Sequence, residues 1–111
     1  MSKVFGCVLA LNLGLTVAGA IAQSPADKQF SPEQVTKGAG IYAQHCATCH
    51  GERMANPPWA IDLATFPRDQ RARFVDSVTY GVRNMPPWGD VIKPEEVAAL
   101  WAYLVAGERK N

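Results

Sequence analysis

The chain has 111 residues, three cysteines and a formal net charge of +1. This length accommodates one domain at most. The hydrophobic fraction of 48% is ordinary for a globular protein and excludes wholesale disorder. A nucleic-acid-binding domain normally carries a basic patch, so the near-neutral charge argues against nucleic acid as a partner.

The first 22 residues have the pattern of a secretory signal peptide. Lys3 is the only charged residue before Asp27, and small and apolar residues dominate the segment 4–22. Ala20-Ile21-Ala22 fits the small-x-small pattern before a cleavage site. We therefore expect residues 1–22 to be removed on export to the periplasm, without stable membrane insertion after cleavage. A retained membrane anchor is the alternative, because the apolar segment is close to spanning length.

The mature chain is predicted to begin with a flexible leader and a helix. Residues 23–30 are polar and include Pro25, and the domain is expected over residues 31–108. Ser31 is a good N-cap, Pro32 suits the first helical position, and Gln34 is placed to complete a capping box. Apolar residues recur at helical spacing and predict one buried face: Val35, Ala39, Tyr42, Ala43 and Cys46.

The middle of the chain is predicted to form a loop and then a second helix. Asn56-Pro57-Pro58 is incompatible with a regular helix, so residues 51–65 are expected to be a loop. The second helix is expected from about Pro67 to Tyr80, and Gly81 is placed to end it. Its apolar contacts are expected to be Phe74, Val75 and Val78.

The last helix is predicted to begin at Pro94, after an irregular loop over residues 84–89. Glu95 and Glu96 lie favourably near its positive end, whereas Lys93 is a poor capping residue. Gly107 is expected to end this helix. Its apolar stripe consists of Val97, Leu100, Trp101 and Leu104.

No segment has the alternating pattern of a strand, so the fold is predicted to be all-α. We expect a small domain of three or more helices with two long loops that contain prolines. Such loops are costly in a small domain unless something orders them. The loops are therefore expected to wrap a bound group.

The run Cys46-Ala47-Thr48-Cys49-His50 predicts the identity of that group. Cys-x-x-Cys-His is the attachment signature of haem c, in which the thiols bond the porphyrin and the histidine ligates the iron. A redox disulfide of the thioredoxin type would require alternating strands and helices. Zinc would require a second pair of ligands, but Cys7 in the signal segment is the only other cysteine.

A second axial ligand is expected from Met85, with Met54 and His45 as the other candidates. Met54 follows His50 by four residues, which span roughly 14 Å at most and are too short to pass around a porphyrin edge. His45 precedes the motif on the same side. Met85 is far enough along the chain, and Pro86 next to it stiffens its loop. An ordinary core position is the competing interpretation of Met85.

Three blocks of the chain resemble the class I c-type cytochromes of the short bacterial monohaem type. They are Gly38-x-x-x-Tyr42-x-x-x-Cys46-Ala47-Thr48-Cys49-His50-Gly51, Gly81-x-x-x-Met85-Pro86 and Leu100-x-x-Tyr103-Leu104. The resemblance implies that the first and last helices cross at Gly38, with Tyr42, Leu100 and Tyr103 in the crossing. It also implies that a proline carbonyl, of Pro57 or else Pro58, accepts a hydrogen bond from His50. The loop over residues 84–89 is similar to haem domains attached to quinoprotein alcohol dehydrogenases.

The resemblance implies an electron carrier, or an electron-transfer subunit, and not an enzyme. One haem c would be attached through Cys46 and Cys49, with His50 and Met85 as axial ligands that leave no open site on the iron. Single electrons would pass between a periplasmic dehydrogenase or other oxidoreductase and a terminal oxidase or reductase. The alternative is a small haem enzyme or sensor in which Met85 is a labile ligand.

The three tryptophans and a group of four arginines are further candidates for contact with the haem. Trp101 is expected in the core, whereas Trp59 and Trp88 are placed to donate to a haem propionate or to pack against the porphyrin. The arginines are Arg68, Arg71, Arg73 and Arg83. They are expected to form a solvated helix face, because acidic residues interleave with them. Pairing with propionates or with an acidic partner is the alternative.

Overall fold

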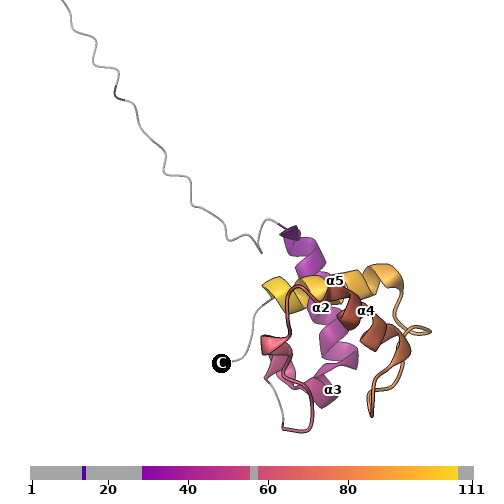
Figure 1. Cartoon of the computed structure of the whole chain (residues 1–111). Coiled ribbons are helices and arrows are strands. Elements are labelled where there is room, and N and C mark those ends of the chain that lie inside the picture. The colour runs from indigo at the N-terminus through magenta and orange to yellow at the C-terminus, as the bar shows by residue number, and fades with distance from the viewer. Residues whose placement is uncertain (1–13, 15–28, 56–57, 108–111) are drawn as a thin grey trace, which may run out of the picture.

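The computed structural model describes residues 14, 29–55 and 58–107. The elements in these ranges are α2 (Pro32–His45), α3 (Ala47–His50), the 3-10 turns η1 (Glu52–Met54) and η2 (Leu63–Thr65), α4 (Arg71–Tyr80) and α5 (Pro94–Ala106). The only strand-like feature in this part of the chain is an isolated bridge between Val82 and Met85. The prediction of an all-α fold is confirmed (Figure 1).

Apart from Gly14, the predicted signal peptide lies outside the described residues, as does most of the predicted leader. In the described ranges, no helix combines the length and the apolar character needed to cross a membrane.

The first and last helices begin and end where the sequence predicts. At the start of α2, the Ser31 hydroxyl accepts a hydrogen bond of 3.1 Å from the Gln34 N–H. At the start of α5, the Glu96 carboxylate accepts the Lys93 N–H at 2.8 Å, so Glu96 compensates for the poor capping side chain of Lys93. Gly107 follows the last residue of α5.

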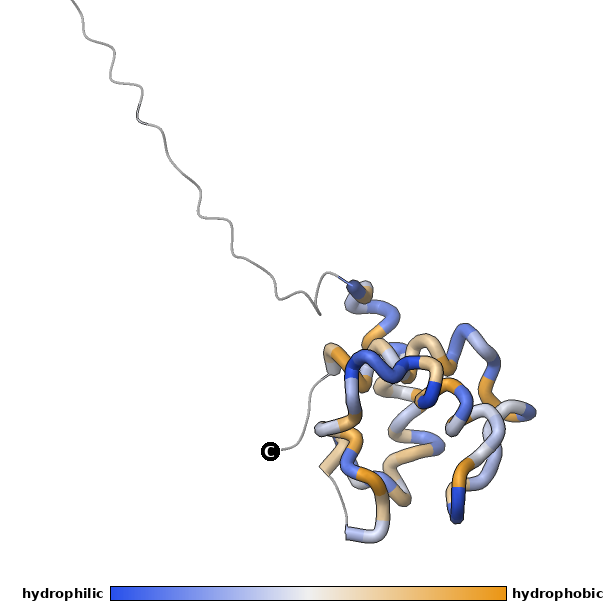
Figure 2. The backbone as a smooth tube through the Cα atoms, in the orientation of Figure 1, coloured by the Kyte–Doolittle hydropathy of each residue, from blue (hydrophilic) through white to orange (hydrophobic). Residues whose placement is uncertain are grey.

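Helix α4 begins at Arg71, so the prediction that it starts near Pro67 is wrong. The Gln70 N–H donates to the Pro67 carbonyl at 3.2 Å, which closes a turn instead of a first helical turn. The Arg68 guanidinium donates to the Phe66 carbonyl at 3.1 Å and holds this turn. The segment around residues 67–73 is strongly hydrophilic in Figure 2, whereas α5 beyond its first turn is largely hydrophobic. Helix α4 ends at Tyr80 as predicted.

Helices α2 and α5 cross closely, and the crossing uses the residues that the sequence predicts (Figure 1). A Cβ atom on Gly38 would overlap the Ala99 carbonyl of α5. The rings of Tyr42 and Tyr103 lie 5.2 Å apart, and both residues are buried together with Leu100. The absence of a side chain at Gly38 therefore brings the two backbones together.

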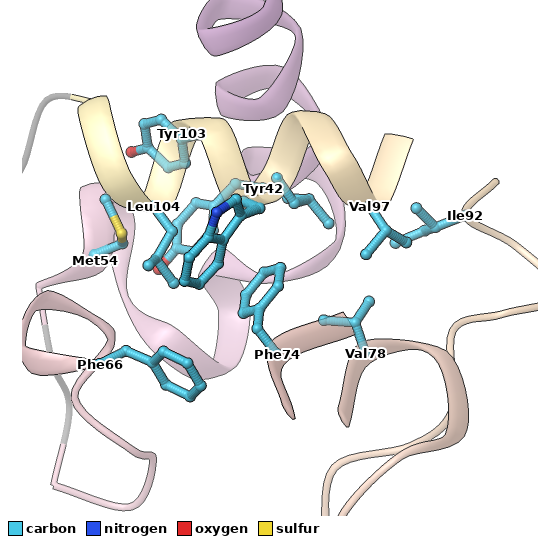
Figure 3. Close-up of a cluster of buried hydrophobic side chains, with 11 residues drawn as sticks. Tyr42, Met54, Phe66, Phe74, Val78, Ile92, Val97, Tyr103 and Leu104 are labelled. Carbon is cyan, nitrogen blue, oxygen red and sulfur yellow. The ribbon is translucent and has the colours of Figure 1, made fainter. Parts of the chain in front are cut away.

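The core lies between α5, α4 and the loops (Figure 3). Trp101 is only 2% exposed and packs against Phe74, with ring centroids 5.3 Å apart, and against Phe66 at 6.2 Å. The predicted apolar stripes of α4 and α5 are buried or pack against this core. Ala43 is an exception on α2, because it is exposed.

Candidate functional site

The cysteine motif forms a short helical continuation of α2. Cys46 follows the last residue of α2, and its carbonyl accepts the N–H groups of Cys49 at 3.2 Å and His50 at 2.9 Å. The two cysteines therefore lie three positions apart on one helical turn. Both are free thiols, with Cys46 half-buried and Cys49 exposed.

Two side chains from outside the motif hold its C-terminal end. The Tyr42 hydroxyl donates to the Gly51 carbonyl at 2.6 Å. The Trp59 indole N–H donates to the Cys49 carbonyl at 3.1 Å, although the Trp59 side chain is 74% exposed. In this structure the Trp59 N–H is thus engaged within the motif. Gly51 has a φ of 82°, which a residue with a side chain rarely adopts.

The His50 side chain is half-buried, and its Nδ1 is buried without a hydrogen-bond partner among the described residues. Burial lowers the pKa of His50, and the nearby Ile61 backbone carbonyl opposes this effect without completing a hydrogen bond to Nδ1. The imidazole is therefore neutral near pH 7 and can donate a lone pair to a metal. Pro57, the expected backbone partner of His50, lies outside the described residues.

Burial also raises the pKa of the Cys46 thiol to about 11, with a smaller contribution from Cys49. A redox-active cysteine has a lowered pKa instead. No three His, Cys, Asp or Glu side chains within the described ranges gather where they could hold a metal ion. The raised pKa of Cys46 disfavours the redox-disulfide interpretation of the motif.

Met85 lies in a tight loop that follows α4. The Val82 N–H donates to the Met85 carbonyl at 3.1 Å, and the Met85 N–H donates to the Val82 carbonyl at 2.9 Å. Gly81 at the start of the loop has a φ of 78°, and Arg83 has a φ of 53°. The Met85 side chain is half-buried and packs against the core.

Trp88 connects this loop to the cysteine motif. Its ring centroid lies 5.3 Å from that of His45, the last residue of α2. Cys46 and Met85 both pack against the same core cluster. The fold therefore brings the Met85 loop to the end of α2, next to the first cysteine of the motif.

Comparison with known proteins decides the family. The family described as "Cytochrome C oxidase, cbb3-type, subunit III" matches residues 33–104. The chain is a c-type cytochrome. Cytochromes of this family carry covalently bound haem c and transfer electrons, so the predictions of a class I monohaem cytochrome, of haem c and of an electron-transfer protein instead of an enzyme are confirmed.

Three relatives illustrate how much of each protein the cytochrome covers. It is 31% identical to cytochrome c6 of Microcystis aeruginosa over 67% of its own length and 98% of the relative. It is 31% identical to quinohemoprotein alcohol dehydrogenase ADH IIB of Pseudomonas putida over 82% of its own length, but 14% of the relative. It is 25% identical to the cbb3-type cytochrome c oxidase subunit FixP of Sinorhizobium medicae over 86% of its own length and 37% of the relative. The chain thus spans nearly all of a small cytochrome and a minor part of the two larger proteins.

The residues of the motif fit a covalently attached haem. Cys46 and Cys49 are unpaired thiols on one helical turn, and His50 carries a neutral imidazole with an unpartnered buried nitrogen. Haem c, the cofactor of the family, would bond the two thiols and take the His50 imidazole as a ligand.

The competing methionine has a different role in the cytochrome. Met54 is only 2% exposed and lies beside Leu104 in the core (Figure 3). It reaches this position through a turn in which Arg53 and Met54 both have positive φ angles, of 51° and 58°. Sequence periodicity gives no signal for such a turn, so the burial of Met54 could not be predicted.

Two of the four arginines take part in local structure. Arg73 lies over the Phe66 ring at 5.1 Å and donates to the Gln70 side chain at 2.7 Å. Arg68 holds the turn before α4. Arg73 therefore lies on a helix face as predicted, whereas Arg68 lies in the turn before α4 and not on a helix face.

Proposed function

We propose that this cytochrome is a periplasmic single-electron carrier, or the electron-transfer subunit of an oxidoreductase complex. One haem c is attached through Cys46 and Cys49, and His50 and Met85 are its axial ligands. The observation that carries this proposal is the pair of unpaired thiols on one helical turn with the half-buried His50, beside the Met85 loop.

Each residue of the proposed site has a distinct task. The bound haem supplies an iron that alternates between Fe(III) and Fe(II). The Cys46 and Cys49 sulfurs keep the cofactor from leaving the protein, and the His50 imidazole donates a nitrogen lone pair. The Met85 thioether is a soft ligand that favours the reduced state and raises the potential relative to a second imidazole. If His50 and Met85 both bound the iron, no coordination position would remain for substrates or oxygen.

The proposed location and partners rest on the sequence and on the relatives. Residues 1–22 are proposed to be a cleaved signal peptide, residues 23–30 a leader and residues 31–108 the cytochrome domain. Relatives include part of an alcohol dehydrogenase and part of a terminal oxidase subunit. We propose a periplasmic dehydrogenase as electron donor and a terminal oxidase or reductase as acceptor. The mass of the purified protein tests the cleavage, with Gln23 as the expected first residue.

The axial ligand is tested with Met85→Ala in the holo-protein. Removing the thioether is expected to abolish the weak methionine-to-iron absorption band of the oxidised protein, to lower the potential and to let cyanide and carbon monoxide bind. Met54→Leu is the matched control, because Met54 lies in the core. Unchanged spectra and ligand binding in Met85→Ala would refute Met85 as the ligand, and a high-spin spectrum of the wild type would favour a haem enzyme or sensor.

Covalent attachment has its own test. A haem stain that survives denaturation is expected for the wild type, and Cys46→Ala or Cys49→Ala is expected to weaken it. A stain that is lost on denaturation of the wild type would contradict attachment through these cysteines.

A further inference from the structure

A ring contact joins the two segments that hold the haem in the proposed function. The centroids of His45 and Trp88 lie 5.3 Å apart, with their planes inclined at 53°. Both side chains are half-buried. His45 directly precedes the cysteine Cys46, and Trp88 follows Met85 by three residues. The contact therefore bridges the attachment segment and the loop of the second ligand.

Trp88 is fixed by its backbone as well as by its ring. Its N–H donates to the Val78 carbonyl in α4 at 2.8 Å. Its carbonyl accepts the N–H groups of Val91 at 2.9 Å and Ile92 at 2.8 Å. These bonds tie the Trp88 backbone to α4 on one side and to the approach to α5 on the other.

The link between Trp88 and Met85 is stiff. The two residues between them are Pro86 and Pro87, and the ring of each proline fixes its φ angle. A stiff link transmits the position of Trp88 to Met85, because few backbone rotations remain to absorb a shift. Whatever holds the Trp88 ring against α2 thereby also limits how far Met85 can move away.

We propose that His45 and Trp88 form a clasp that holds the Met85 loop against the attachment segment and slows the release of Met85 from the iron. The proposal rests on the function above, in which Met85 is an axial ligand. His45 and Trp88 are positioning residues, since they act through Met85. An aromatic pair of this kind contributes roughly twofold to tenfold in the equilibrium between the closed and open loop.

The test measures cyanide binding to the oxidised holo-protein, because cyanide can bind only after Met85 has left. His45→Ala and Trp88→Ala are each expected to accelerate binding by about twofold to tenfold. The double variant is expected to be no faster than the faster single variant, because both remove the same contact. Trp88→Phe, which keeps a ring, is expected to stay close to the wild-type rate. Tyr80→Ala is the control, since Tyr80 is a 75% exposed aromatic residue close to the same loop.

Urea unfolding of each variant shows whether faster cyanide binding comes from a general loss of stability or from loss of the clasp. His45→Ala and Trp88→Phe keep the test decisive if Trp88→Ala does not fold. Wild-type cyanide rates in His45→Ala, or additive effects in the double variant, would overturn the clasp. If Met85→Ala binds cyanide readily while His45→Ala behaves like the wild type, the clasp fails and the proposed ligand stands. If Met85→Ala also behaves like the wild type, both fail.

Discussion

The cysteine motif and the Met85 loop, the two segments proposed to hold the haem, are anchored to the domain in different ways. The motif continues α2, and the buried Tyr42 holds its end through the Gly51 carbonyl. The Met85 loop combines short-range geometry, with a positive φ at Gly81 and two hydrogen bonds between Val82 and Met85, with the contacts of Trp88 to α4 and His45.

Because of this difference, substitutions in the two segments should have different effects on the site. A change at the motif is transmitted to the helix crossing, because Tyr42 belongs to both. A change in the Met85 loop disturbs a segment that can open while the helices stay packed. Movement of Met85 away from the iron should therefore cost less free energy than global unfolding. Three substitutions test this division between the two segments.

The largest effect is expected from Gly38→Ala at the helix crossing. The added methyl group would overlap the Ala99 carbonyl and approach the Tyr103 Cβ atom at 2.9 Å. The helices must separate to make room, which is expected to lower the free energy of unfolding by about 3 kcal/mol. Urea unfolding of the holo-protein measures this loss.

Gly40→Ala is the matched control, because it lies in the same helix and its added Cβ atom meets nothing within 4 Å. It is expected to raise the free energy of unfolding by about 0.5 to 1 kcal/mol, since alanine favours helix over glycine. Equal effects of the two substitutions would mean that the close crossing contributes nothing to stability.

A smaller and more local effect is expected from Gly81→Ala in the Met85 loop. Gly81 has a φ of 78°, and an added Cβ atom would lie 2.7 Å from the Met85 carbonyl oxygen and 2.9 Å from the Pro87 nitrogen. The strain is expected to be about 2 kcal/mol and to fall on the loop. Cyanide binding to the oxidised protein should accelerate more than the urea midpoint falls. A loss of stability with unchanged cyanide binding would contradict a loop that opens independently of the helices.

Local signals predicted the helix ends that depend on local chemistry. Ser31 and Pro32 at the start of α2, Pro94 at the start of α5, and glycines after α4 and α5 each act within a few residues of the helix that they limit. The start of α4 escaped prediction because Pro67 is as suitable for a turn as for a helix. The choice depends on the Arg68 side chain and the Phe66 carbonyl.

The parts of the site that form a local sequence pattern could be predicted. The parts that depend on tertiary contacts could not. Cys46, Cys49 and His50 form a local pattern, so their neighbourhood follows from the sequence. Met85 stays a prediction as ligand, although its stiff loop has been located. The bond from Trp59 to the Cys49 carbonyl and the contact of His45 with Trp88 join distant segments. No spacing rule in one sequence reveals such pairs.

The smallest effect is expected from Tyr42→Phe, which removes one hydrogen bond on the motif side. Loss of the donor to the Gly51 carbonyl should lower the free energy of unfolding by about 1 kcal/mol near neutral pH. Tyr80→Phe is the control, because Tyr80 is largely exposed. Cyanide binding should stay at the wild-type rate, since the Met85 loop is untouched. If Tyr42→Phe accelerated cyanide binding as much as Gly81→Ala does, the cysteine motif and the Met85 loop would not be independent.

Tyr42→Phe is also expected to change how the stability of the protein depends on pH. Burial raises the pKa of Tyr42 above its usual value, whereas the unfolded chain releases this proton near the ordinary tyrosine pKa of about 10. Above that pH the unfolded state binds fewer protons than the folded state, so wild-type stability should fall as pH rises. Urea midpoints of the reduced protein at about pH 8 and about pH 11 should converge between wild type and Tyr42→Phe. A constant difference between the two proteins would mean that the Tyr42 hydroxyl titrates alike in the folded and unfolded states, contrary to its burial beside the motif.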